Sequence, residues 1–157
     1  MEFHSIISLT VLFVLSFSAA SSGAVFRPGN WYARLEKPSW TPPNWAFPLV
    51  WTTLFTLMSI SAWLVWEDTG LAGWRALLLY IVHLVINAGW SFLFFGRRRL
   101  DWAMAEVVLL WLAIAAVIAA FAQINMTAAL LLTPYLAWVT LAAALNLRLL
   151  QMNGARG

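Results

Sequence analysis

The chain reads W-Y-A-R-L-E-K-P-S-W-T-P-P-N-W-A-F-P-L-V-W from Trp31 to Trp51. This stretch holds four of the eleven tryptophans and four of the six prolines of the protein. Each proline removes a backbone donor and clashes with the preceding helical turn, so the stretch is not the interior of a helix. It is also too aromatic for a solvated linker. We therefore predict an ordered, amphipathic connection that lies against an apolar surface.

The composition indicates what that apolar surface is. Of the 157 residues, 63% are hydrophobic and only 10% are charged, whereas ordinary soluble domains carry about 25% charged residues. The class predicted is therefore an integral membrane protein. The absence of cysteine excludes disulfides, thiolate metal sites and cysteine nucleophiles. No nucleic-acid partner is expected, because the one basic cluster, Arg97–Arg99, adjoins a predicted span.

Five apolar runs surround the quoted stretch, and each is close to the 20 residues that cross about 30 Å of hydrocarbon. The runs cover residues 5–25, 45–66, 74–95, 102–122 and 128–150. The first is predicted to be a retained span rather than a signal peptide, since residues 1–4 lack Lys and Arg. We expect an all-α membrane protein with a single domain over residues 1–157. Its fold would be a bundle of five transmembrane helices, with a long ordered loop between helices 1 and 2.

The placement of Lys and Arg predicts the orientation. With five spans, the N-terminus and the second and fourth loops share one side of the membrane, where Arg75 is the only basic residue. The others lie in the first loop, in the Arg97–Arg99 cluster and near the C-terminus. The positive-inside rule therefore predicts an N-terminus outside and a cytoplasmic C-terminus. A chain without cysteine and with a short cytoplasmic tail suits a bacterial membrane.

Polar side chains within a span are costly and are functional candidates for that reason. Tyr80, His83, Asn87 and Ser91 follow one another at helical spacing, so they share one face of the third span. The stripe either lines a ligand cavity or supplies hydrogen bonds between helices. For His83 a packing role is favoured over ligation of haem iron.

Aromatic and small residues suggest a flat cavity between the second and fifth spans. Trp51 and Phe55 share a face of the second span, whereas Pro134, Trp138 and Ala142 follow at i+4 spacing in the fifth. Pro134 is expected to bend its helix. The small Ala142 beside Trp138 leaves a gap that a planar ligand can fill by stacking on aromatic rings. The alternative is plain packing between helices.

The sequence shows no catalytic constellation, whether a Gly-rich phosphate loop, paired carboxylates at depth or metal-ligand spacing. Glu106, one turn inside the fourth span, is predicted to pair with an arginine of the third loop or to lie at the positive end of its helix. These residues alone predict a five-span binding or transport protein with an aromatic interior, and they do not specify the ligand.

The motif W-Y-x-x-L-x-K-P-x-W-x-P-P-x-W, from Trp31 to Trp45, resembles the first loop of the translocator protein family, the tryptophan-rich sensory proteins. Trp51 follows it as in that family. Further matches are Asn87, Phe94–Gly96, the P-Y-L-x-W motif from Pro134 to Trp138, and Leu145–Asn146. The resemblance covers nearly the whole chain in the same order, and its first-loop motif is long and specific.

This resemblance implies a five-helix bundle, commonly a homodimer, that binds protoporphyrin IX or haem. Animal members also bind cholesterol and isoquinoline carboxamides. Carried over by position, the ligand-binding residues would be Trp51, Phe55, Asn87, Trp90, Trp138 and Ala142. The lid over the pocket would include Trp31, Trp40, Pro42 and Pro43. No metal site and no obligatory cofactor are implied.

Two departures from the family pattern limit what carries over. Residues 145–148 read L-N-L-R and lack the tyrosine of the animal cholesterol motif. Ser91 follows Trp90 where many members have proline. The function implied is binding of porphyrins and related hydrophobic ligands in tetrapyrrole transport or stress sensing. The alternatives are light-dependent porphyrin degradation, which would rest on oxidisable tryptophans, and a ligand-regulated structural partner of another membrane complex.

Overall fold

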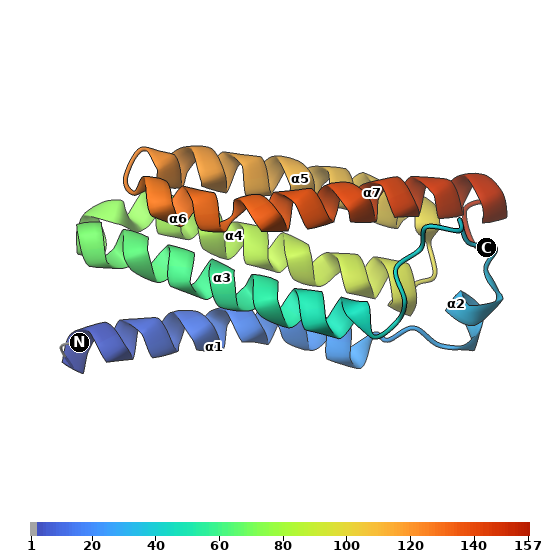
Figure 1. The fold of residues 1–157 in the computed structure, drawn as a ribbon, viewed down its shortest axis with the longest axis horizontal. Helices are drawn as coiled ribbons and strands as arrows, with labels where there is room; N and C mark the ends of the chain where they lie inside the picture. The colour runs from blue at the N-terminus through green and yellow to red at the C-terminus, as the bar shows by residue number, and fades with distance from the viewer. Residues whose placement is uncertain (1–2) are drawn as a thin grey trace.

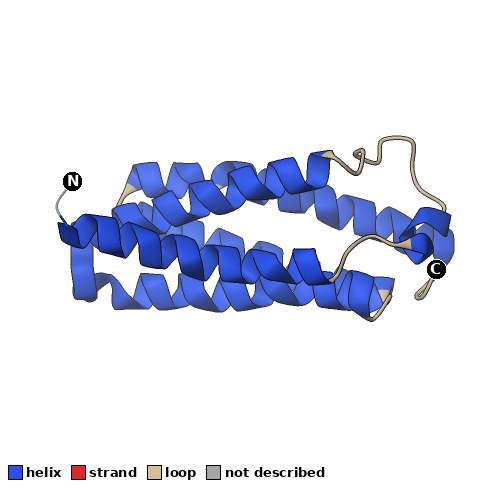
Figure 2. Ribbon diagram, turned by 90° about the horizontal axis from the view of Figure 1, so that it is seen from below, coloured by secondary structure: helices blue, strands red, loops and turns tan. Residues whose placement is uncertain are grey.

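The computed structural model describes residues 3–157, and within them every regular element is helical. Long helices lie side by side along one axis and form a bundle (Figure 1; Figure 2). The elements are α1 (Phe3–Val25), α2 (Asn30–Arg34), α3 (Ala46–Thr69), α4 (Trp74–Ser91), α5 (Leu100–Ala122), α6 (Met126–Leu131) and α7 (Thr133–Asn153). The predicted all-α membrane fold with a five-helix bundle is confirmed.

Four helical segments of the described chain are long and apolar enough to cross a membrane. One of them, Ala46–Gly96, has 51 residues and contains both α3 and α4. The short 3-10 helix Gly70–Gly73 separates these two helices, which run side by side in opposite directions (Figure 1). The second and third predicted spans therefore correspond to α3 and α4. The fifth corresponds to α6 and α7 together.

The break between α6 and α7 follows from Pro134. A proline has no N–H to donate to the carbonyl four residues earlier, which here is the carbonyl of Leu130. The Thr133 hydroxyl donates to that Leu130 oxygen instead, at 2.7 Å. The i to i−4 backbone hydrogen bonds of the helix resume with the Leu136 N–H, which donates to the Leu132 carbonyl at 3.1 Å. The expected bend is thus a short interruption, in which the Leu130 carbonyl accepts from the Thr133 hydroxyl.

The end of α4 widens into a π turn over Phe92–Gly96. The Arg97 N–H donates to the carbonyl of Phe92, five residues back, at 2.8 Å. Such turns insert one extra residue into a helix and rotate the side chains that follow. Gly96 closes the turn where the chain has little space, because a Cβ atom built there would lie 2.9 Å from Phe26 Cδ1.

The connection between α1 and α3 contains the short helix α2, and it lies against the C-terminal end of the chain (Figure 1). The Glu36 N–H donates to Asn153 Oδ1, and Asn153 Nδ2 donates to the Glu36 carbonyl, each at 2.8 Å. Trp31 Nε1 donates to the carbonyl of Arg156 at 2.9 Å. Tyr32 is buried in α2, and this burial raises the pKa of its hydroxyl.

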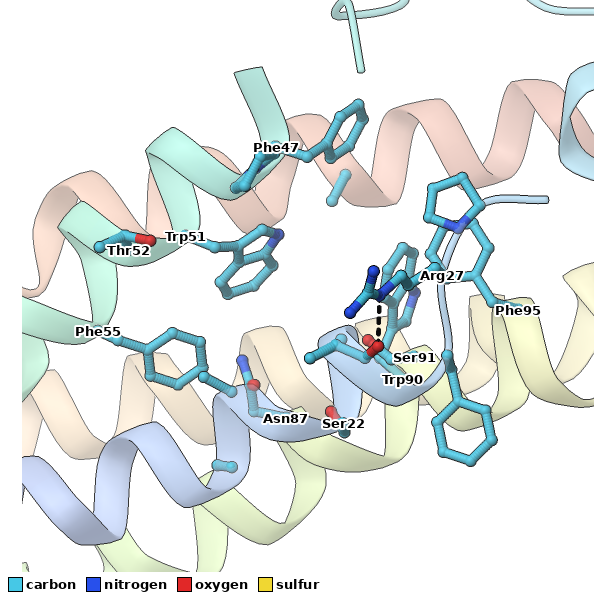
Figure 3. A pocket seen from close by; sticks show the side chains of 18 of the residues that line it. Ser22, Arg27, Phe47, Trp51, Thr52, Phe55, Asn87, Trp90, Ser91 and Phe95 are labelled. Atoms are coloured by element: carbon cyan, nitrogen blue, oxygen red, sulfur yellow. Dashed lines mark hydrogen bonds between the residues drawn. The ribbon is translucent and has the colours of Figure 1, made fainter. Parts of the chain in front are cut away.

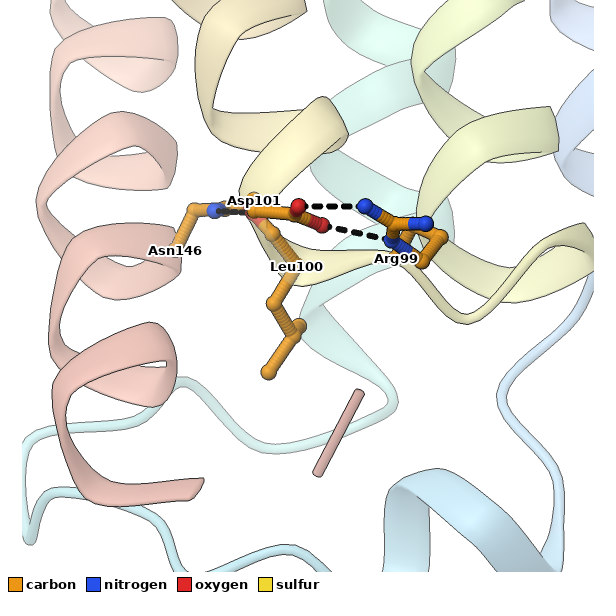
Figure 4. Close-up of polar contacts among 4 residues, drawn as sticks. All are labelled: Arg99, Leu100, Asp101 and Asn146. Atoms are coloured by element: carbon orange, nitrogen blue, oxygen red, sulfur yellow. Dashed lines mark hydrogen bonds and ion pairs between the residues drawn. The ribbon is translucent and has the colours of Figure 1, made fainter. Parts of the chain in front are cut away.

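Polar bonds between helices fix their register. The hydroxyls of Ser16 and Tyr80 lie 2.6 Å apart, and the Ser61 hydroxyl donates to the Ala128 carbonyl at 2.6 Å. At the other end of the bundle, Asn146 Nδ2 donates to the Leu100 carbonyl at 2.8 Å (Figure 4). Interhelical hydrogen bonds of this kind replace the hydrophobic force that is missing between helices in lipid.

The predicted ion pair of Glu106 is wrong. Arg99, of the third loop, instead donates through Nε to Asp101 Oδ1 at 2.8 Å (Figure 4). Asp101 is only two residues from Arg99, in the first turn of α5. Both side chains remain partly exposed to solvent, so the pair forms without burial of either charge. Glu106 is more deeply placed, and neither of its carboxylate oxygens has a hydrogen-bond partner among the described residues.

Candidate functional site

A cavity of about 650 Å³ lies inside the bundle, at the end where the first connection runs. Its walls come from α1, the first connection, α3, α4, α5 and α7. Ligand pockets of proteins usually have about 300–1,000 Å³ and mostly apolar walls with a few polar groups. Figure 3 shows that aromatic side chains of α3 and α4 point into this space from different sides.

The aromatic part of the wall includes Trp51 and Phe55 of α3 and Trp90 of α4. The ring centroids of Trp51 and Phe55 lie 5.7 Å apart, because a spacing of four residues places them on one helical face. Trp90 stacks on Phe94, with ring centroids 4.7 Å apart. Rings held in this way offer flat, fixed faces to a planar ligand.

Asn87 is the polar residue in the middle of the cavity wall (Figure 3). Its Nδ2 donates to the hydroxyl of Tyr135 on α7 at 2.7 Å. This bond ties α4 to α7 and fixes the orientation of the amide. The amide oxygen has no hydrogen bond within the described part of the chain, so it is available to accept one from a ligand.

The rest of the predicted polar stripe divides between two roles. Ser91 lines the cavity with Asn87, whereas Tyr80 and His83 are absent from its lining. Tyr80 bonds to Ser16 of α1, and His83 Nδ1 lies 2.6 Å from the Tyr80 carbonyl. Tyr80 therefore joins α4 to α1, whereas the hydrogen bond of His83 stays within α4 and its ring packs against Tyr135 of α7, with centroids 5.6 Å apart.

Of the two residues expected from the fifth span, Ala142 lines the cavity and Trp138 does not. Trp138 packs instead against Phe47 of α3, with ring centroids 5.8 Å apart and nearly perpendicular planes. Phe47 itself lines the cavity. Trp138 thus contacts a residue of the cavity lining without belonging to that lining.

The predicted lid residues Trp31, Trp40, Pro42 and Pro43 are absent from the cavity lining. Trp31 packs edge-on against Phe94 at the end of the bundle, with ring centroids 6.0 Å apart, and the Trp40 side chain is exposed. The two ends of the connection border the cavity instead. These ends are residues 26–28 after α1 and Asn44 before α3.

Sequence reasoning missed several lining residues, among them Ser22, Gly23, Phe26, Arg27 and Phe47. The small, polar second half of α1 was a usable signal, because small residues let a helix approach a cavity without filling it. Arg27 lies before the Trp31–Trp45 motif, so no sequence pattern marked it as a cavity residue. It is the one charged residue among those that line the cavity, and its Nε donates to the Ala24 carbonyl at 2.5 Å (Figure 3).

Comparison with known proteins identifies the relatives of this bundle. The model of the TspO/MBR family matches residues 6–152. Protein CrtK of Rhodobacter capsulatus is 42% identical over 154 residues, which cover 95% of this chain and 94% of that protein. The tryptophan-rich sensory protein of Cereibacter sphaeroides is 42% identical over 137 residues, with 87% and 85% covered. The translocator protein of Ovis aries is 40% identical over 130 residues, with 81% and 77% covered.

These matches span nearly the whole bundle, including the helices and the connection that surround the cavity. Together with the long apolar helices, they make the chain an integral membrane protein. The protein therefore belongs to the TspO/MBR family.

Proposed function

We propose that this protein binds porphyrins, such as protoporphyrin IX or haem, and acts in tetrapyrrole transport or stress sensing. One observation carries the proposal: the cavity of about 650 Å³ has Trp51, Phe55 and Trp90 on its walls. A porphyrin is large, flat and mostly apolar, so it matches a space bounded by aromatic faces. The family resemblance of the first-loop motif points to the same ligand class.

The polar groups of the cavity suit a ligand that is bound in one orientation. The free amide oxygen of Asn87 can accept a hydrogen bond, and the Ser91 hydroxyl lies one turn further along α4. The side chain of Ala142 is small, so a planar molecule has room to lie against α7 at this position. Related hydrophobic ligands, such as sterols or isoquinoline carboxamides, would occupy the same space.

The proposed orientation in the membrane rests on the placement of Lys and Arg, and the proposed kind of membrane rests on the absence of cysteine and the short C-terminal tail. We propose an N-terminus outside, a cytoplasmic C-terminus and a bacterial membrane, with the cavity near the cytoplasmic face where the first connection lies. We also propose a homodimer, on the basis of the family resemblance alone. In this orientation a porphyrin made in the cytoplasm has direct access to the end of the bundle that holds the cavity.

A titration tests the proposal. Protoporphyrin IX and cholesterol are added side by side to the purified protein in dodecyl maltoside, and binding is followed by tryptophan quenching and by the porphyrin absorbance. Ala142→Phe places a ring in the cavity and should weaken porphyrin binding at least tenfold. Ala144→Phe, on the exposed side of α7, is the matched control and should bind as the wild type does.

Two outcomes would contradict the proposal. Saturable binding that Ala142→Phe leaves unchanged would place the porphyrin elsewhere, and no saturable binding would remove porphyrins as ligands. Illumination of the bound sample adds a further readout. A new product spectrum, lost in Trp51→Phe and Trp90→Phe variants, would favour light-dependent porphyrin degradation over reversible binding.

A further inference from the structure

Arg27 introduces a positive charge into an otherwise uncharged cavity wall. It follows the last turn of α1, where the Phe26 N–H still donates to the Ser22 carbonyl at 2.8 Å. Pro28 comes next and restricts the backbone of Arg27 to extended conformations. Arg27 is a solvent-exposed residue of the cavity lining, with the end of α1 before it and the proline after it (Figure 3).

The guanidinium of Arg27 is anchored but not neutralised. Its Nε donates to the Ala24 carbonyl at 2.5 Å, which satisfies a carbonyl at the C-terminal end of α1. Its two terminal nitrogens make no hydrogen bond to any described residue, and no described carboxylate lies within 4.0 Å of them. Anchoring one edge of the group leaves the opposite edge free for a partner.

No acidic group of the described chain supplies that partner. Asp101 is bound to Arg99, and the buried carboxylate of Glu106 has no partner of its own. Lys37, in the same connection, is engaged differently, because it donates to the carbonyls of Ala33 and Leu35. The free edge of Arg27 therefore presents a local positive charge beside aromatic walls.

We propose that Arg27 is an anion-binding site that recognises a carboxylate at the edge of the ligand whose planar body lies in the cavity. The proposal rests on the proposed function and narrows it to planar aromatic ligands that carry acidic groups. A guanidinium donates two parallel N–H bonds to a carboxylate, and the pairing is stronger than bonds between neutral groups. A neutral planar molecule of the same shape would fill the cavity without using Arg27.

The test compares protoporphyrin IX, which carries two carboxylates, with its uncharged dimethyl ester. Both are titrated into the intact protein in dodecyl maltoside, so that no lipid phosphate competes for Arg27. The variants are Arg27→Gln, Arg27→Lys and Arg34→Gln. Arg34 is an exposed arginine of α2 outside the cavity lining, and it serves as the matched control for the loss of one positive charge.

We expect the wild type to bind the acid at least tenfold more tightly than the ester, in line with the strength of hydrogen bonds to charged groups. Arg27→Gln should remove most of this preference by weakening binding of the acid while the ester stays within twofold. Arg27→Lys should retain part of the preference, because it keeps the charge but loses the paired geometry. Arg34→Gln should retain all of it.

The outcomes separate this inference from the proposed function. If the wild type binds neither compound saturably, the proposed function fails and this inference fails with it. If both compounds bind and the ratio of their affinities is the same in the wild type and in Arg27→Gln, only the anion site is refuted. Equal weakening of both compounds by Arg27→Gln would also refute it, since Arg27 would then act only as a cap of α1.

Discussion

Replacing Asn87 with leucine should weaken the contact between α4 and α7. Asn87 Nδ2 donates to the Tyr135 hydroxyl at 2.7 Å, and the exposed fractions of the two residues are 7% and 1%. Water does not reach the Tyr135 hydroxyl, so the loss of Asn87 leaves it without its partner. Tyr135→Phe removes the other half of the bond and leaves the Asn87 amide facing the cavity, where water can replace the hydroxyl.

The size of the effect follows from what such a bond contributes in a membrane protein. Interhelical hydrogen bonds measured by double-mutant cycles contribute about 0.6 kcal/mol on average and about 1.7 kcal/mol at most, because helices that separate within the membrane find other partners. The Asn87–Tyr135 bond is short and both residues are buried, so we expect a coupling energy in the upper half of this range. Asn87→Leu should lower the free energy of unfolding more than Tyr135→Phe does. The reason is that it leaves the Tyr135 hydroxyl, the more deeply buried group, without a hydrogen-bond partner.

The assay is the free energy of unfolding in mixed micelles for the wild type, the two single variants and the double variant. Tyr135→Phe combined with Ser61→Ala is the control pair, since Ser61 bonds to Ala128 instead, and its effects should add. Additivity within about 0.3 kcal/mol for Asn87→Leu and Tyr135→Phe would refute the reasoning. Asn87 would then serve the cavity alone.

Three further changes test other parts of the structure. Gly96→Ala should lower stability by about 1–3 kcal/mol and weaken porphyrin binding, since the new Cβ would press on Phe26 at the cavity edge; unchanged thermal unfolding would contradict this. Glu106→Met should raise the free energy of unfolding by about 1–3 kcal/mol, because both carboxylate oxygens are buried without a partner; a lower value would show that the carboxylate has a favourable role. Trp31→Phe removes the bond to the Arg156 carbonyl and should speed proteolysis within residues 26–45, whereas equal cleavage rates would show that this bond does not hold the connection.

The five-helix bundle could be predicted from hydrophobicity because a membrane imposes the length of each span. The predicted runs 45–66 and 102–122 match α3 and α5 to within three residues. The details that the sequence did not specify depend on local backbone bonds. The bend expected at Pro134 is a break between two helices. The π turn over Phe92–Gly96 contains no proline and no internal glycine from which the sequence could predict it.

Helical spacing brought most of the expected cavity residues to one place, since Trp51, Phe55, Asn87, Trp90 and Ala142 all line the cavity. Periodicity reports which residues share a helical face, and it does not report what lies in front of that face. Trp138 shows the difference, because it shares a face with Ala142 but packs against Phe47 and does not line the cavity.

The first connection was the hardest part to predict. Its prolines correctly indicated an interruption between helices, but the direction of each side chain depends on contacts distant in sequence. The paired bonds between Glu36 and Asn153 hold the connection against the C-terminus, and Trp31 faces that contact rather than the cavity. Arg27 lies outside the tryptophan and proline motif, so only the structure brought it to the cavity.

The most direct test of the central claim locates the bound porphyrin among the eleven tryptophans. The protein is labelled with 5-fluorotryptophan, the fluorine resonances are assigned by single Trp→Phe variants, and protoporphyrin IX is titrated in. Binding in the cavity predicts saturable shifts of the Trp51 and Trp90 resonances, while the exposed Trp74 and Trp102 stay unchanged. Shifts confined to Trp74 and Trp102 would place the porphyrin on the outer surface of the bundle and contradict the account.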